Sequence, residues 1–199
     1  MKIAKKFMAL ALAAVLSVGC AFCVSADGSR TKDVTVSQEQ SQIYEIIQKI
    51  EDTEGVKDLQ QKYPTIAEAF QKVGEGKMDM PEFIDVLKAL ATDEKDETLK
   101  AKLEEVIEKL DGKDFVTGFT QFKVLDATRA EKNADGKYEV EISIPSMENI
   151  QLLCYNAEKN EWSVVDPISV DKENKTLKVA LDDLCYFSVI ADAKADTTK

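Results

Sequence analysis

The chain has 199 residues, with 26 basic and 37 acidic side chains, a formal net charge of −11 and no histidine. Without histidine this sequence cannot form a Ser-His-Asp or Cys-His nucleophilic site, a histidine-ligated zinc site or an imidazole proton shuttle. The negative charge argues against nucleic acid and anionic membrane surfaces as partners, because both require a basic protein surface.

Residues 1–26 have the pattern of a secretory signal peptide. Lys2, Lys5 and Lys6 form a basic start, and residues 7–19 form a largely apolar run that is too short to span a bilayer. Small residues follow at the −3 and −1 positions of a cleavage site after Ala26. The sequence therefore predicts an exported bacterial protein whose mature chain has no transmembrane segment.

An alternative for the same region is lipidation at Cys20. Residues 17–20, Ser-Val-Gly-Cys, resemble a bacterial lipobox, in which the cysteine becomes the lipid-bearing N-terminus. Cleavage after Ala26 and lipidation at Cys20 both remain open at this point. In either case Cys20 and Cys23 do not form a redox or zinc motif, because they lie inside or beside a removed segment.

After a polar tether over residues 27–36, the pattern predicts a helical bundle domain over residues 37–112. Residues 37–40, Ser-Gln-Glu-Gln, have the form of a capping box, which favours the start of a helix. Apolar residues then recur at i, i+3, i+4 and i+7, the spacing of one helix face: Ile43, Ile46, Ile47 and Ile50.

Cap and turn residues predict four further short helices. The first ends before Pro64, since the residue before a proline avoids the α region. Residues 65–68 form a second capping box, with Gly74 as the C′ residue, and Asp79 begins the next helix. The last helix stops at residues 111–112, Asp-Gly. Their apolar faces include Val56, Leu59, Ile66, Phe70, Val73, Phe83, Leu87, Leu103, Val106 and Leu110.

The period changes to that of strands over residues 113–192, and a polar tail follows over residues 193–199. Residues 133–136, Asn-Ala-Asp-Gly, are typical of a hairpin turn. Apolar residues alternate with polar ones from Tyr138 to Ile144, as in a half-buried strand. Short strands at this spacing predict an antiparallel β-sandwich. The predicted fold class is therefore α+β, with a helical bundle and a β-sandwich as two segregated domains.

The β half also resembles a known module. Residues 138–145, YEVEISIP, and residues 152–156, LLCYN, are followed by a closing segment, CYFSVIA, at residues 185–191. These segments resemble the strands of a small immunoglobulin-like β-sandwich module found in secreted and surface proteins of Firmicutes. The histidines usual in that module are absent, and Asn156 and Tyr186 stand near their places. The resemblance implies an extracellular spacer or adhesive unit.

Cys154 and Cys185 are the only cysteines left after signal removal. In an exported chain they suggest a disulfide, which would close a loop of about 30 residues and stabilise the fold by about 3 kcal/mol. The alternative is a pair of reduced, buried thiols that act as small apolar side chains. The Cα atoms must lie within about 7 Å for the bond to form.

Three aromatic residues of the β half are candidates for stacking on sugar rings: Tyr155, Trp162 and Tyr186. The competing interpretation places Trp162 in the core, where aromatic side chains dominate small β proteins. No metal and no cofactor are predicted. Residues 131–136 have the form of the start of a calcium loop, but Ile142 stands where the bidentate glutamate is required.

Together these features predict a non-catalytic interaction or structural protein of the cell envelope or extracellular space. Its partner would be a protein or glycan there that the sequence does not identify. Two alternatives stay open: a lipid-anchored binding component, and a secreted hydrolase that uses paired carboxylates.

Overall fold

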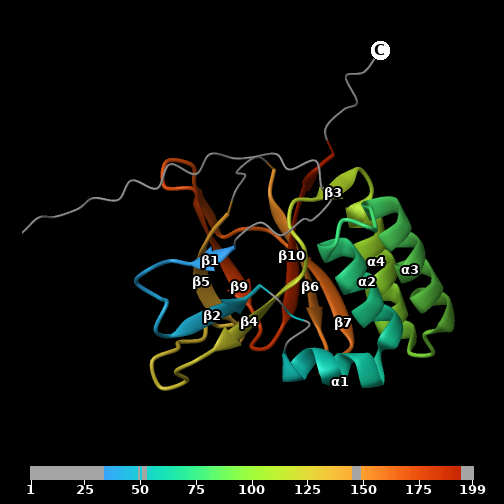
Figure 1. The fold of residues 1–199 in the computed structure, drawn as a ribbon, viewed down its shortest axis with the longest axis horizontal. Helices are drawn as coiled ribbons and strands as arrows, with labels where there is room; N and C mark the ends of the chain where they lie inside the picture. Colours follow the sequence, from blue (N-terminus) through green and yellow to red (C-terminus); the bar gives the residue numbers. More distant parts are fainter. Residues whose placement is uncertain (1–33, 49, 51–52, 145–148, 194–199) are drawn as a thin grey trace, which may run out of the picture.

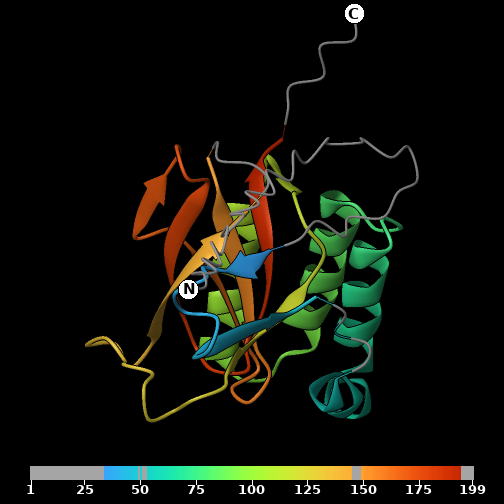
Figure 2. The same cartoon turned by 60° about the vertical axis from the view of Figure 1, so that its left-hand side comes forward.

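The computed structural model describes residues 34–48, 50, 53–144 and 149–193. The predicted signal peptide, Cys20, and most of the tether and tail lie outside these residues. Within the described part, four helices and two antiparallel sheets form three layers. Figures 1 and 2 show the helices on one side of the molecule and the sheets on the other.

The outer layer is a four-stranded sheet in which every neighbouring pair is antiparallel. Its order is β1-β5-β9-β8, and it lies farthest from the helices (Figure 1). The strands are β1 (Thr35–Val36), β5 (Tyr138–Ser143), β9 (Thr176–Leu181) and β8 (Ser169–Asp171).

The middle layer is a six-stranded antiparallel sheet of order β2-β4-β10-β6-β7, with β3 also paired to β10. Because β10 pairs with β6, β4 and β3 along its length, it forms the centre of this sheet. The strands are β2 (Tyr44–Ile47), β3 (Lys113–Phe115), β4 (Thr120–Val124), β6 (Gln151–Asn156), β7 (Glu161–Val165) and β10 (Tyr186–Asp192).

The third layer consists of α1 (Glu54–Lys62), α2 (Pro64–Gly74), α3 (Met80–Asp93) and α4 (Glu97–Leu110). The predicted helical pattern over residues 56–110 is confirmed. Asp79 and Glu82 form a complete capping box at the start of α3. The predicted capping box at residues 65–68 is wrong, because α2 begins at Pro64 with Tyr63 as its N-cap, so Thr65 lies inside the helix. The left-handed residue after α2 is Gly76, with φ of 68°, and not Gly74.

The helix predicted from residue 37 to Ile50 is wrong. Residues 38–43 form turns, and Tyr44–Ile47 form the edge strand β2 beside β4. Gln40, expected to cap a helix, instead accepts a hydrogen bond from the Glu141 backbone N–H at 2.8 Å. The apolar run was short and rich in β-branched isoleucine, so its spacing fitted both a helix and a strand that pairs with a distant partner.

The mixed α+β class is confirmed, whereas the segregation into two domains and the immunoglobulin-like topology are not. The chain contributes β1 and β2 to the two sheets before it enters the helices, and it returns to the six-stranded sheet at β3. Of the predicted tether, Thr35–Val36 form β1. The domain boundary between residues 112 and 113 stays a prediction.

The six-stranded sheet is apolar on both faces. Along β6, Leu152 and Cys154 face the four-stranded sheet, and Leu153 and Tyr155 face the helices. Along β10, alternate residues divide between the same two cores. Successive side chains of a strand point to opposite faces, so one strand can supply two cores only if nearly every residue is apolar.

A cluster of aromatic rings joins the helices to the sheet. Phe70 of α2 stacks on Phe119 with a centroid distance of 3.8 Å, and meets Trp162 edge to face at 5.8 Å. Phe83 of α3 also meets Trp162 edge to face, at 5.6 Å. Such pairs contribute about 0.5–1.5 kcal/mol each beyond the area that they bury, so this cluster ties the helical layer to the sheet.

A substitution at Gly55 of α1 tests how closely the helical layer lies on the sheet. A Cβ atom at Gly55 would lie 2.7 Å from the Tyr186 hydroxyl and 2.8 Å from Nε2 of Gln121. We predict that Gly55→Ala lowers the free energy of unfolding by about 1–3 kcal/mol, because buried neighbours must move to admit the methyl group. Urea unfolding followed by circular dichroism measures this change.

Gly74→Ala is the matched control, since a Cβ atom at Gly74 of α2 meets nothing within 4 Å. Alanine is the better helix former, so this variant should be as stable as the parent or up to about 1 kcal/mol more stable. If the two variants were equally stable, the close approach of α1 to the sheet would be contradicted.

Candidate functional site

A cleft with a volume of about 170 Å³ lies where the helices meet the turn between β6 and β7. Three separate segments form it: the junction of α1 and α2, the connection from α3 to α4, and residues 160–162. Its apolar lining comes from Tyr63, Ile66, Leu90, Leu99, Leu103 and Trp162. Its polar lining comes from Asp93, Glu94, Lys102, Asn160 and Glu161.

The aromatic wall of the cleft is held by the core behind it. Trp162 lies on β7, is 5% exposed, and contacts the rings of Phe70 and Phe83 from the core side. Tyr155 packs against Trp162 with a centroid distance of 4.6 Å, and meets Tyr63 edge to face at 6.3 Å. The two rings that reach the cleft, Tyr63 and Trp162, are therefore fixed through one buried tyrosine.

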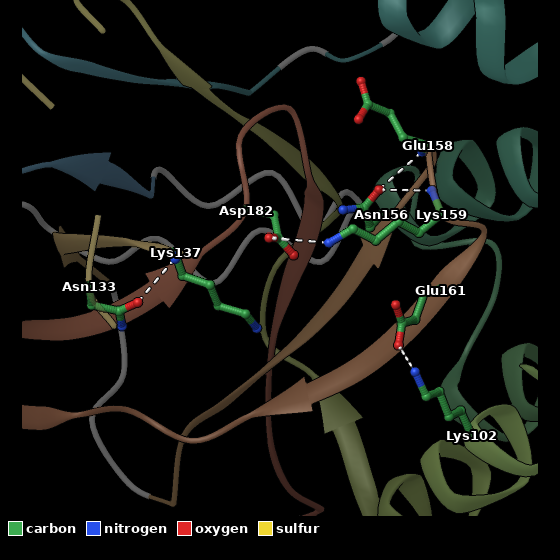
Figure 3. A network of polar contacts seen from close by, with 8 residues as sticks. All are labelled: Lys102, Asn133, Lys137, Asn156, Glu158, Lys159, Glu161 and Asp182. Atoms are coloured by element: carbon green, nitrogen blue, oxygen red, sulfur yellow. Dashed lines mark hydrogen bonds and ion pairs between the residues drawn. The ribbon is translucent and has the colours of Figure 1, made fainter. Parts of the chain in front are cut away.

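The turn beside Trp162 is fixed by side-chain hydrogen bonds (Figure 3). Asn156 Oδ1 accepts from the backbone N–H groups of Glu158 and Lys159, at 3.0 and 3.1 Å. Asn160 has a left-handed φ of 51°, which asparagine tolerates better than most residues. Its Oδ1 accepts a hydrogen bond of 3.0 Å from the Tyr155 hydroxyl. The floor of the cleft is thus a pre-formed loop.

The polar rim carries more negative than positive charge. Lys102 of α4 forms an ion pair with Glu161 of β7, which joins the helical layer to the sheet edge (Figure 3). Glu94 Oε1 accepts from the backbone N–H groups of Lys95 and Asp96, at 2.8 and 2.9 Å. With Lys102 paired to Glu161, the carboxylates of Asp93 and Glu94 leave the rim with two net negative charges.

Of the three aromatic residues predicted to stack on a ligand, only Trp162 lines the cleft. Tyr155 and Tyr186 are 0% and 1% exposed and lie in the core between the six-stranded sheet and the helices. Neither ring has a face open to solvent in this structure, because the helices cover the face of the six-stranded sheet on which both rings lie. Stacking on a ligand therefore remains a prediction for Trp162 alone.

Cys154 and Cys185 lie in the other core, between the two sheets, and are not bonded to each other in the structure. Cys154 is opposite Phe187 in the pairing of β6 with β10, so Cys185 is its diagonal neighbour on the same face. Burial raises the pKa of the Cys154 thiol to about 12 and that of Cys185 well above its usual range. The disulfide stays a prediction.

Sequence reasoning missed most of the cleft. The charged run over residues 93–97 is typical of a solvated helix start, and Asp96 does cap α4. Nothing in the spacing indicated that Glu94 and Asp93 would border an apolar cleft, because its other walls come from Tyr63 and Trp162, far away in the sequence. Lys102 and Glu161 are charged residues on a predicted helix and strand, with no local signal that they would pair.

Among the described residues, no group of three or more Cys, Asp or Glu side chains is arranged to hold a metal ion. The described helices are also too short or too polar to cross a membrane. Where hydrogen bonds or ion pairs shift the pKa of a described carboxyl group, the shift is downward. These groups are Glu75, Glu105, Asp126, Asp171 and Asp192.

Comparison with family models matched no family, and comparisons with curated proteins and with solved structures found no significant match. The resemblance to the immunoglobulin-like module of Firmicute surface proteins therefore stays a prediction.

The buried thiols give a prediction for reactivity. A thiol alkylates only as its thiolate, and burial disfavours that form at Cys154 and Cys185. After reduction, we expect iodoacetamide at pH 8 to modify both thiols at least about 100-fold more slowly in the native protein than in urea. Mass spectrometry measures both rates. A native rate within about tenfold of the denatured rate would contradict the burial.

Stability should depend on pH in the alkaline range. The pKa values of Cys154, Cys185, Tyr155 and Tyr186 are raised, mainly by burial, and that of Tyr186 reaches about 12. A folded state that holds its protons more tightly loses stability once the unfolded chain ionises, from about pH 8.5 for Cys and about pH 10 for Tyr. We expect the urea midpoint to be constant up to about pH 8 and to fall above pH 9.

Replacing both cysteines by alanine separates the contribution of the thiols to this alkaline loss of stability from that of the tyrosine phenols. The fall should then begin near pH 10, since only the phenols remain to ionise. An unchanged midpoint up to pH 11 in the parent protein would be inconsistent with buried neutral thiols and phenols.

Proposed function

We propose that this protein is an exported, non-catalytic binding protein of the cell envelope or extracellular space, and that the cleft beside Trp162 is its binding site. The observation that carries this proposal is the pre-formed apolar cleft, whose rim groups are held by neighbours within the fold. Export rests on the signal peptide predicted over residues 1–26.

The chemistry of the cleft supports binding. Ligand sites are typically concave, mostly apolar and furnished with a few oriented polar groups. Here six side chains supply the apolar or aromatic wall. Asn160 is fixed by the Tyr155 hydroxyl, and Glu161 by Lys102. A site on such fixed elements recognises a ligand without first ordering itself, which lowers the entropic cost of binding.

The acidic groups favour binding over hydrolysis. A carboxyl group that acts as a general acid at neutral pH needs a raised pKa, which burial or a neighbouring anion provides. The described carboxyl groups with shifted pKa values shift the other way, as at Glu75 and Asp171, and none of them lines the cleft. These shifts are those of solvent-exposed, hydrogen-bonded carboxylates, so these five groups lack the raised pKa of a general acid at neutral pH.

The size of the cleft limits how much of a partner can enter it. The volume of the cleft, about 170 Å³, is below the range of about 300–1,000 Å³ that is typical of binding sites for drug-sized ligands. A protein or glycan partner would therefore insert a single side chain or terminal group, with the rest of its contact on the surrounding surface. A small molecule would fill the cleft alone.

Trp162 is the only tryptophan in the chain, so its fluorescence reports on the cleft. We expect one or more members of a panel of soluble peptides and cell-wall oligosaccharides to change its emission saturably. Leu99→Tyr, which adds bulk inside the cleft, should weaken that binding at least tenfold, because the ligand and the added ring compete for the same space. Thr92→Tyr, at an exposed position of α3 outside the cleft, should leave it unchanged.

The same samples, analysed by mass spectrometry, test the alternatives. Recovery of the ligand intact is expected, and recovery of a cleaved product would favour the carboxylate hydrolase. A mature protein that begins with a lipid-bearing Cys20 would favour the lipid-anchored component. If Leu99→Tyr and the parent protein bound equally well, the cleft would not be the binding site.

A further inference from the structure

The charge and lining of the cleft beside Trp162 select one class of ligand. Three carboxylates and one ammonium group line it, and the ammonium group of Lys102 is paired with Glu161. The rim therefore presents negative charge from Asp93 and Glu94, on the side where α3 ends. The whole chain is also acidic, with a net charge of −11, so long-range attraction draws cations and repels anions.

Two aromatic side chains also line the cleft. Tyr63 and Trp162 both line the cleft, and both are fixed by contact with Tyr155. The faces of Trp and Tyr rings attract cations, and recognition of quaternary ammonium groups is the best-known use of that attraction. Ile66 and the three leucines Leu90, Leu99 and Leu103 supply the rest of the apolar lining, and they favour apolar substituents over a hydrated metal ion.

We propose that this cleft binds a small alkylated ammonium ion, with its alkyl groups against the leucines and rings and its charge facing Asp93 and Glu94. This inference rests on the proposed function, since it names the ligand class of the same cleft. A volume of about 170 Å³, below that of sites for drug-sized ligands, suits a compact cation or a single cationic group on a longer chain.

The residues that line the cleft argue against two other classes of ligand, anions and divalent metal ions. An anion would face the carboxylates of Asp93 and Glu94 without a free cationic partner in the cleft, because Lys102 is already paired. A bare divalent metal requires six or more oxygen ligands, or several carboxylates in one place. One oxygen of Glu94 already accepts two backbone hydrogen bonds, and most of the remaining lining is apolar.

The test is a fluorescence titration of the full mature chain with choline, and with its uncharged isostere 3,3-dimethyl-1-butanol. Trp162 is the only reporter, so a saturable change in emission marks occupancy of the cleft. We expect choline to bind at least tenfold more tightly than the alcohol, because the two have almost the same shape and differ in charge.

A pair of double variants isolates the rim charge. Asp93→Asn with Glu94→Gln removes both rim carboxylates and keeps an oxygen at position 94 to accept the hydrogen bonds from the backbone N–H groups of Lys95 and Asp96. Glu104→Gln with Glu108→Gln makes the same change in net charge on an exposed part of α4 outside the cleft. Choline binding should weaken at least tenfold in the first variant and stay within twofold in the second.

The source of the cation is resolved by a third probe, a short peptide that carries one trimethyllysine. Equal affinity for the peptide and choline would show that only the head group is recognised, whereas tighter peptide binding would point to a polymer-borne group. Either result supports the inference.

Three results would overturn the inference: no saturable change with either cation, equal affinity for the isostere, or equal losses in the two double variants. The proposed function would still stand if another ligand of the peptide and oligosaccharide panel bound in a way that Leu99→Tyr weakened. The two proposals can therefore fail separately.

Discussion

The structure depends on burial of both faces of the six-stranded sheet. Its central strands β6 and β10 supply one set of apolar side chains to the four-stranded sheet and the alternate set to the helices. Neither covering layer can be removed without exposing large side chains such as Tyr155 or Phe187 to water, at about 25 cal/mol for each Å² of apolar surface. The aromatic cluster around Phe70 fixes how the helices lie on that sheet.

The candidate site lies at the edge of the six-stranded sheet, where the burial of its two faces ends. Strand β7 is an edge of the sheet, and α4 lies against it (Figure 1). The cleft lies at this margin between the helical layer and the sheet, with Trp162 of β7 in its lining. The Lys102–Glu161 ion pair holds the two layers together at that margin, and the turn at Asn160 closes the floor. The same packing that stabilises the fold thereby fixes an aromatic ring at the wall of a cleft with an acidic rim.

Local signals predicted the parts of the fold that local forces determine. The cap at Asp79, the turn at residues 133–136 and the alternation from Tyr138 were all readable, because each depends on residues close in sequence. Residues 44–47 were misassigned, since a short isoleucine-rich run becomes a strand only through its pairing with β4. The burial of Tyr186 and the cleft could not be predicted, because both arise where the helices cover a sheet face.

The most direct test of this account is whether the helical layer and the two sheets unfold together. Urea unfolding can be followed by Trp162 fluorescence for the helix–sheet core, by thiol reactivity of Cys154 and Cys185 for the inter-sheet core, and by far-ultraviolet circular dichroism for the helices. The account predicts one transition with coincident midpoints for the three probes, as for a two-state protein. Loss of the helical signal in a separate, earlier transition, with the thiols still protected, would contradict it.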